Sequence, residues 1–250
     1  DKFGIPVFIN NDGDLFAYGE AIAGLLPHVN GLLEQAVSPK RYHNLFGVTL
    51  GTGFGGGIVS RGELHRGDNS LPGEIWLMRH KLLPQMNAEE GACIRAVRRV
   101  YAEQAGIPFD AAPDPRAIAA IASGEQPGDK AAAMESYRRL GEVVGDALGN
   151  ALTLIDGLAV IGGGVSNAHR HFLPAVVDEL NGHYTSPDGK KFRRLAQAVF
   201  NLEDPVQFEN FLRGDAREVI VPGSGRKVSH DPMPRIGVGI SRLGTSEAVA

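Results

Sequence analysis

The stretch from Leu50 to Gly57 reads LGTGFGGG and restricts the possible folds of this chain more than any other segment. Glycine has no Cβ atom, so backbone or a ligand can approach its peptide groups closely. The apolar run Leu45–Leu50 leads into the stretch and Ile58–Ser60 follows it, which is typical of two strands joined by a turn. We therefore expect a hairpin with an exposed backbone, in a chain that has 33 glycines among its 250 residues.

Two interpretations of this glycine-rich turn remain open. The backbone N–H groups of Gly51, Gly53 and Gly55 and the hydroxyl of Thr52 form a donor set that can cradle a phosphate. The stretch lacks the GKS or GKT ending of a P-loop and does not fit the spacing of a dinucleotide site. The alternative is a plain hairpin turn, although five glycines in seven residues exceed what a turn requires.

A second glycine turn, Gly162-Gly163-Gly164, follows the buried-type strand Leu158–Ile161. Apolar residues at helical spacing come after it, so this unit is a strand, a turn and a helix. The first N–H groups of a helix have no partner within the helix and can bind phosphate. These three glycines are therefore candidate contacts for a nucleotide.

Two carboxylates stand in turns that suit contact with a hydroxylated substrate. Asn11-Asp12 ends the apolar run Ile5–Ile9, and a carboxylate at a strand end is well placed as a general base toward a hydroxyl. Glu74 follows Gly73 in a glycine-containing loop, where it can accept hydrogen bonds from vicinal hydroxyls. An Asx turn at Asn11 and a surface turn at Glu74 are the structural alternatives.

Periodic patterns alternate between strands and helices along the rest of the chain and predict an α/β fold. Helices are expected from Asp14 to near Pro27 and over 88–105, 114–123 and 129–155, and late strands at 218–222 and 236–240. Gly141, Gly145 and Gly149 recur in the longest helix, and close helix packing explains them better than a ligand does. Residues 184–214 have no clean period and are expected to be an insertion.

Composition excludes several classes of protein. The net charge of −4 and the isoelectric point near 6.1 leave no basic footprint for nucleic acid. The single cysteine, Cys93, excludes an internal disulfide framework and a multi-cysteine zinc cluster. The chain has no apolar run of about 18 residues and shows no secretory leader, so we expect a cytoplasmic protein that does not bind membranes.

In this order and at these distances, the segments resemble the ROK family of repressors, open reading frames and sugar kinases. The matching motifs are Asn11-Asp12 with Gly19-Glu20, Leu50–Gly57 with Gly73-Glu74, and Gly162–Ser166, which are similar to the family's ND…GE segment, LGTGxGGG…GE block and GGGVS turn. The likeness runs from about Pro6 to the C-terminus and is weaker between Tyr184 and Gly214.

The resemblance implies an actin-like ATPase fold of the hexokinase type, in which two α/β lobes enclose a cleft. It implies that Asp12 deprotonates a sugar hydroxyl, that Asn11 and the Gly73-Glu74 pair contact the sugar, and that Thr52 and Gly53 contact phosphate. The implied reaction is ATP- and Mg²⁺-dependent phosphorylation of a hexose or an N-acyl hexosamine. The implied assembly is a homodimer.

Three departures from the family pattern change this expectation. The N-terminal DxGGT phosphate loop is absent and only about one turn of a closing helix remains, so the chain is expected to be truncated at both ends. Residues 1–250 are then the C-terminal lobe, with the end of the N-terminal lobe at about 1–30. Leu77 stands where the family has a histidine, and only Cys93 remains of its zinc cluster, so we expect no structural zinc and a packing or surface role for His80.

Two functions from different classes follow from the resemblance. The first is a sugar kinase, which the presence of Asp12 favours, with weak or no activity expected of this chain alone. The second is the sugar-sensing domain of a ROK-type transcriptional repressor, which would bind DNA through a winged helix ahead of this region. Trp76 and the Leu82-Leu83 pair are candidate contacts of a dimer in either case.

Overall fold

A six-stranded mixed sheet with the strand order β3-β2-β1-β4-β10-β7 forms the centre of the structure. The computed structural model describes Gly4 and residues 10–243, so the strand expected at Ile5–Ile9 and the closing helix near Thr245 lie outside the described residues. In spatial order, the strands are β3 (Glu63–Leu64), β2 (Phe54–Ser60), β1 (Asn44–Leu50), β4 (Leu158–Gly162), β10 (Arg235–Ile240) and β7 (Ala198–Asn201).

The strand pairing brings several carboxyl ends to one edge of the sheet. β1 is antiparallel to β2, with Leu50 opposite Phe54, and parallel to β4, with Thr49 opposite Gly162. β4 is in turn parallel to β10, and β10 to β7. Ligands of open α/β sheets bind beyond the carboxyl ends of the parallel strands, so this edge is where a site is expected.

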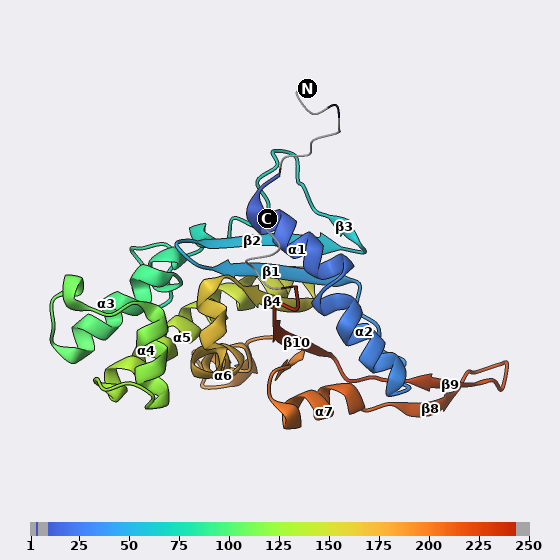
Figure 1. The fold of residues 1–250 in the computed structure, drawn as a ribbon. Coiled ribbons are helices and arrows are strands. Elements are labelled where there is room, and N and C mark those ends of the chain that lie inside the picture. Colours follow the sequence, from blue (N-terminus) through green and yellow to red (C-terminus); the bar gives the residue numbers. More distant parts are fainter. Residues whose placement is uncertain (1–3, 5–9, 244–250) are drawn as a thin grey trace.

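Two helices near the N-terminus follow one another, of which the first packs on β1 and β2 and the second packs against the first (Figure 1). They are α1 (Asp12–Ile22) and α2 (Leu25–Gln35). The sequence pattern predicts Asp14 as the cap of α1 and an end near Pro27, and both expectations are wrong. The side-chain oxygen of Asn11 caps α1, and Pro27 lies in the first turn of α2, where its missing N–H has no helical partner to lose.

A second group of helices lies apart from α1 and α2 (Figure 1). It comprises α3 (Ile94–Ala105), α4 (Pro115–Ser123), α5 (Lys130–Ile155) and α6 (His169–Leu180). Asp129 caps α5, as the sequence predicts, and Asp114 caps α4. The helix expected over 88–105 is interrupted, because a 3₁₀ turn at Ala88–Gly91 precedes α3.

α5 and α6 pack extensively against each other, and the contact forms over the glycines of α5. A Cβ atom on Gly141 would lie 2.5 Å from the carbonyl oxygen of Phe172, and one on Gly145 would lie 2.9 Å from that of Val176. Close helix packing is thus confirmed for these two glycines. Gly149 differs, since the side chain of Arg194, from another segment, fills the space beside it.

The segment expected to be an insertion is only partly peripheral. The hairpin of β5 (His183–Thr185) and β6 (Lys191–Arg193) stands apart from the main sheet. β7, however, pairs with β10 as an edge strand of that sheet, and α7 (Pro205–Arg213) packs on it. β7 and α7 are therefore part of the main body although these short elements gave no clear period, and an insertion over 184–214 stays a prediction.

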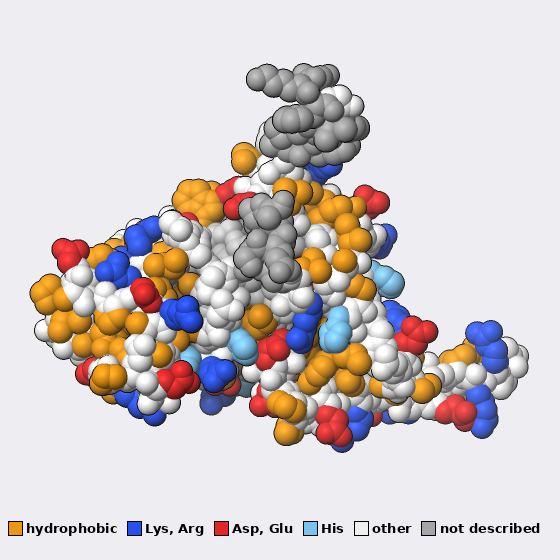
Figure 2. Space-filling model, in the orientation of Figure 1, with side chains coloured by type: hydrophobic (Ala, Val, Ile, Leu, Met, Phe, Trp, Pro, Cys, Tyr) orange, Lys and Arg blue, Asp and Glu red, His pale blue; other side chains and the backbone are white. Residues whose placement is uncertain are grey.

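A further hairpin, β8 (Arg217–Ile220) with β9 (Lys227–His230), projects from the body and carries charged side chains of both signs (Figure 2). Across the face shown there, Lys and Arg side chains alternate with Asp and Glu. In the part of the chain that the structure describes, no helix is both long and apolar enough to span a bilayer.

Candidate active site

A cavity of about 600 Å³ opens beyond the ends of β1 and β4. It collects ten of the eleven site residues predicted from the sequence, namely Asn11, Asp12, Gly51, Thr52, Gly53, Gly55, Gly73, Glu74, Gly163 and Gly164. The eleventh, Gly162, is the buried last residue of β4 and is not among the lining residues. Residues that are distant in sequence therefore meet at the edge of the sheet where the parallel strands end.

The N-terminus of α1 presents Asn11 and Asp12 to the cavity. The Oδ1 atom of Asn11 accepts hydrogen bonds from the N–H groups of Gly13 at 2.8 Å and Asp14 at 3.4 Å. This cap engages the side-chain oxygen, so the amide NH₂ group is the part of Asn11 that can donate to a ligand. Asp12 is exposed at the start of the helix, where the free N–H groups favour a negative charge.

The loop between β1 and β2 is shorter than the glycine pattern predicts. It contains only Gly51, Thr52 and Gly53, while Gly55, Gly56 and Gly57 are residues of β2. A Cβ atom on Gly57 would lie 2.6 Å from the carbonyl oxygen of Gly13, so this glycine lets α1 rest directly on the strand. The hairpin interpretation thus explains the glycines of β2, and the candidate phosphate contacts narrow to the loop and Gly55.

Glu74 enters the cavity next to an indole ring. Trp76, in a 3₁₀ turn at Ile75–Leu77, donates a hydrogen bond from Nε1 to Oε2 of Glu74 and also lines the cavity. Gly73 has a φ of 82°, and a Cβ atom there would lie 2.8 Å from the carbonyl oxygen of Gly56. Leu77, by contrast, is 60% exposed and is not among the lining residues.

Negative charge dominates the cavity wall. The lining includes the carboxylates of Asp12, Glu74 and Glu89 and, in the described part of the chain, no lysine or arginine. Nearby Asp14 is buried, and this burial raises the pKa of its carboxyl group; the charge of Glu74 adds to the rise and that of Arg66 opposes it. An anionic ligand such as a polyphosphate therefore needs an accompanying cation in this cavity.

Sequence reasoning missed several lining residues, including Phe16, Trp76 and Glu89. Phe16 lies one helical turn from Asp12, so its position was within reach of the helical pattern. Glu89 carried no such signal, because the 3₁₀ turn that holds it reaches the cavity only through tertiary contacts.

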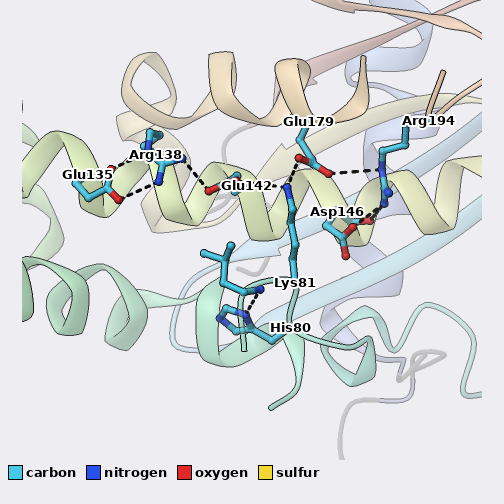
Figure 3. A network of polar contacts seen from close by, with 9 residues as sticks. His80, Lys81, Glu135, Arg138, Glu142, Asp146, Glu179 and Arg194 are labelled. Carbon is cyan, nitrogen blue, oxygen red and sulfur yellow. Dashed lines mark hydrogen bonds and ion pairs between the residues drawn. The ribbon is translucent and has the colours of Figure 1, made fainter. Parts of the chain in front are cut away.

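The segment that carries Glu74 and Glu89 is fastened at its middle to α5 and α6 (Figure 3). Lys81 forms ion pairs with Glu142 of α5 and Glu179 of α6. Glu179 also faces Arg194, which pairs with Asp146 at 2.8 Å. The network links the segment to the second group of helices, away from the cavity.

His80 supports the same segment from within. Its Nδ1 atom accepts hydrogen bonds from the N–H groups of Leu82 and Leu83, both at 3.1 Å. The side chain is buried, and this burial lowers the pKa of the imidazole, with the charge of Arg99 adding to the effect and that of Glu90 opposing it. The predicted packing role of His80 is confirmed.

Among the described residues, no group of three or more His, Cys, Asp or Glu side chains is arranged to hold a metal ion.

A second cavity, of about 490 Å³, begins where the first one ends. Gly164 lines both, and the second also includes Arg116, Tyr137, Arg170 and His171. His171 shares a hydrogen bond of 3.0 Å between its Nε2 atom and the hydroxyl of Ser123. The glycine turn after β4 therefore stands between two adjoining hollows.

Comparisons with known proteins agree with this geometry. A crystal structure of a glucokinase from Parabacteroides distasonis is 50% identical, with a TM-score of 0.90, and the likeness covers all of this chain and 67% of that one. A glucokinase from Streptomyces coelicolor is 30% identical over 188 residues, and an N-acetyl-D-glucosamine kinase from Photobacterium profundum is 29% identical over 184. Each of these two matches covers 66% of this chain and 54% of the relative.

Repressors are also among the relatives. A xylose repressor from Bacillus subtilis is 31% identical over 75 residues, which is 30% of this chain and 16% of the repressor. The chain thus spans about half the length of the curated kinases it matches.

The sequence profile of the ROK family matches residues 1–206. The sheet order, the cavity at its carboxyl edge and the glucokinase structures agree with that match, and the fold is the actin-like ATPase fold expected from the motifs. The chain belongs to the ROK family.

Proposed function

We propose that this chain carries the acceptor side and a phosphate-binding loop of an ATP-dependent sugar kinase, with glucose as the first candidate substrate. One observation carries the proposal: the carboxylates of Asp12 and Glu74 and the loop of Gly51–Gly53 line the same cavity. The 50% identity to a structure described as a glucokinase supports glucose over other sugars. An N-acyl hexosamine is the second candidate, because the relatives include N-acetyl-D-glucosamine kinases.

In this proposal Asp12 is the catalytic base. Its carboxylate orients one sugar hydroxyl and accepts the proton of that hydroxyl. As the proton leaves, the hydroxyl oxygen bonds to the γ-phosphorus of ATP and the bond from phosphorus to the bridging oxygen of ADP breaks. Phosphoryl transfer depends mainly on positioning and electrostatics, so an exposed carboxylate on a fixed helix end suits the role.

The remaining sugar contacts come from both sides of Asp12. The amide NH₂ group of Asn11 donates to a hydroxyl, and Glu74 accepts from vicinal hydroxyls. The hydrogen bond from Trp76 restricts the rotation of the Glu74 carboxylate, and the indole ring adds an apolar surface to the cavity wall. Gly73 allows the backbone before Glu74 to lie against β2.

For the nucleotide we assign the phosphates to the loop and the nucleoside to the adjoining cavity. The N–H groups of Gly53 and Gly55 and the hydroxyl of Thr52 donate to phosphate oxygens. The N–H group of Gly51 already donates to the carbonyl oxygen of Gly53 at 3.0 Å, so Gly51 contributes open space for the phosphate rather than a hydrogen bond. Gly163 and Gly164 form the turn at the boundary of the two cavities, where the absence of side chains leaves room for the nucleotide. Gly162 precedes this turn as the last residue of β4. When bound, Mg²⁺ offsets phosphate charge, and the carboxylate oxygens of Asp12 are donors of the kind it prefers.

The alternative function is that of a sugar sensor in a repressor. The similarity to a xylose repressor favours it, but that match covers only 30% of this chain. A sensor requires the sugar contacts but does not require a catalytic base such as Asp12. The two functions therefore differ in turnover rather than in sugar binding.

The decisive experiment measures sugar-dependent ADP formation by the full-length protein with glucose, N-acetylglucosamine and N-acetylmannosamine. Asp12→Asn should lower kcat by about a thousand-fold while sugar binding by calorimetry changes only a few-fold. Asp110→Asn, on an exposed 3₁₀ turn, is the matched control and should match wild type. Equal turnover by Asp12→Asn would refute the role of Asp12, and sugar binding without turnover by wild type would favour the sensor.

The remaining sequence predictions stay predictions. We expect the isolated 250-residue chain to have weak or no kinase activity, and turnover comparable to that of the full-length protein would contradict this. A homodimer, a cytoplasmic location and the absence of a structural zinc are likewise expected, and mass measurement in solution and metal analysis would test the first and the last.

A further inference from the structure

One lining residue has no role in the proposed chemistry so far: Glu89. Its Oε2 atom accepts a hydrogen bond of 3.2 Å from the N–H group of Phe54, the first residue after the candidate phosphate loop. A Cβ atom on Gly53 would lie only 2.8 Å from the same Oε2 atom. The carboxylate of Glu89 therefore supports the C-terminal side of the loop.

Arg95, in the first turn of α3, supports the middle of the loop. Its Nη1 atom donates to the carbonyl oxygen of Thr52 at 3.2 Å, and its Nη2 atom pairs with Glu89 at 3.3 Å and Glu90 at 3.2 Å. The neighbouring N–H group of Ile94 donates to the carbonyl oxygen of Gly51 at 2.9 Å. The segment from Glu89 to Arg95 thus contacts each end and the middle of the loop.

These contacts address two physical problems of a phosphate loop. Two of its three residues are glycines, which have the largest conformational freedom, so the loop needs external contacts to hold one shape. In addition, a carboxylate beside the loop repels phosphate unless a cation pairs with it. Arg95 meets both needs, because it bonds the loop backbone and pairs with Glu89.

We propose that Glu89 and Arg95 are a pair of positioning residues that hold the Gly51–Gly53 loop in its phosphate-binding shape and neutralise the carboxylate beside it. This proposal rests on the proposed function, since it assumes that the loop binds the phosphates of ATP. It predicts that loss of the pair affects the nucleotide and spares the sugar, whose contacts lie on α1 and at Glu74.

Arg95→Met tests the pair most directly. The KM for MgATP should rise about ten-fold, which corresponds to roughly 1.4 kcal/mol, while the KM for sugar changes by less than about two-fold. Arg95→Lys should recover part of the loss, because an ammonium group can pair with Glu89 but cannot bridge Thr52 at the same time. The matched control is Arg98→Met, since Arg98 lies on the same helix but donates to Ala112 and stacks on Phe109.

Glu89→Gln separates shape from charge. The amide oxygen of glutamine still accepts from Phe54, but the negative charge is gone. The double variant Glu89→Gln/Arg95→Met should therefore bind MgATP more tightly than Arg95→Met alone, because no unpaired carboxylate then faces the phosphates. Equal or weaker binding by the double variant would overturn the charge argument.

A second readout does not depend on activity. Amide hydrogen exchange at residues 51–54 of the nucleotide-free protein should be faster in Arg95→Met and unchanged in Arg98→Met. If wild type has no kinase activity, the proposed function fails while exchange still reports whether the pair orders the loop. If wild type is active but Arg95→Met keeps its KM for MgATP and its exchange rates, the positioning role is wrong.

Discussion

Glycines serve different purposes at the cavity and at the two packed interfaces. Gly57 under α1 and Gly141 under α6 are each pressed against backbone, so packing alone accounts for them. Gly51 and Gly164 line the cavity, where an added Cβ would meet no heavy atom of the described chain within 4 Å, and neither has a positive φ. The comparison teaches that a glycine pattern points to a ligand only where neither packing nor backbone conformation already requires glycine.

The same two parts of the molecule also differ in how they are held together. The α5–α6 pair and its neighbours carry a network of ion pairs that reaches from Glu135 to Arg194 (Figure 3). The cavity wall carries carboxylates whose cationic partner, apart from Arg95, must come from a ligand. Four substitutions, three of them with a matched second variant, can break or sharpen this comparison.

The largest effect is expected at the α1–β2 interface. In Gly57→Ala, the methyl group would lie 2.6 Å from the carbonyl oxygen of Gly13 and 2.9 Å from Cβ of Ala17, so α1 must move. We expect a loss of about 3 kcal/mol in the free energy of unfolding, measured by urea denaturation followed by circular dichroism. Turnover should fall as well, because the same helix carries Asp12.

Gly141→Ala is the matched variant at the α5–α6 interface. The clash with Phe172 is comparable, but helix propensity offsets about 1 kcal/mol of it, and the cavity is distant. Stability should fall by about 1–2 kcal/mol, with KM values at the wild-type level. A loss of stability at Gly57 no greater than that at Gly141 would contradict the comparison.

The next effect concerns the ion-pair network. The side chain of Arg194 is only 6% exposed, so Arg194→Met leaves Asp146 and Glu179 without their buried cation. We expect the free energy of unfolding to fall by about 2 kcal/mol. The side chain of Arg138 is 51% exposed, so Arg138→Met should change this free energy by about 0.5 kcal/mol in the same denaturation experiment. Similar losses in the two variants would show that burial does not set the strength of these pairs.

A third variant tests whether the cavity glycines serve a ligand. Gly51→Ala should leave the midpoint of thermal unfolding within a few degrees of wild type, yet weaken MgATP binding by about ten-fold, because the methyl group occupies space kept for phosphate. Gly31→Ala, on α2, also adds a methyl group in open space and should leave binding unchanged. Calorimetric titration with MgATP measures both. If Gly51→Ala binds MgATP with wild-type affinity, the open space beside Gly51 is not where the phosphate binds.

The smallest effect is a pH dependence from His80. Burial lowers the pKa of its imidazole below the usual 6.5, so the unfolded chain binds the proton more readily than the folded one. The stabilisation is complete above about pH 6.5 and is lost as the pH falls through the pKa of the folded state. His80→Asn keeps an acceptor for Leu82 and Leu83 but does not titrate, so unfolding free energies measured from pH 7.5 to 5 should decline less steeply. A slope equal to that of wild type would contradict the contribution assigned to His80.

Much of the local structure and most of the candidate site could be read from the sequence. The long helix that Asp129 caps and the buried strand at Leu158–Ile161 depend on apolar period and on capping, which are local properties. The residues of the candidate site could be predicted because glycine-rich turns and carboxylates at these spacings are compatible with only a few structural or binding roles. The sequence alone thus determined the family, the sheet-based fold class and ten residues of one cavity wall.

Other features were decided only by the tertiary structure. Gly55, Gly56 and Gly57 belong to a strand because they pair with β1, and Gly57 gives room to α1; contacts between distant segments leave no local pattern. Short elements such as β7 have too few residues to show a period, so their place in the main sheet was not predicted. The position of Arg194 was also not predictable, because no local pattern indicates that its guanidinium fills the buried space beside Gly149. Tertiary packing determines the structural role of these residues, because the burial of a residue depends on the whole fold and not on the residue type.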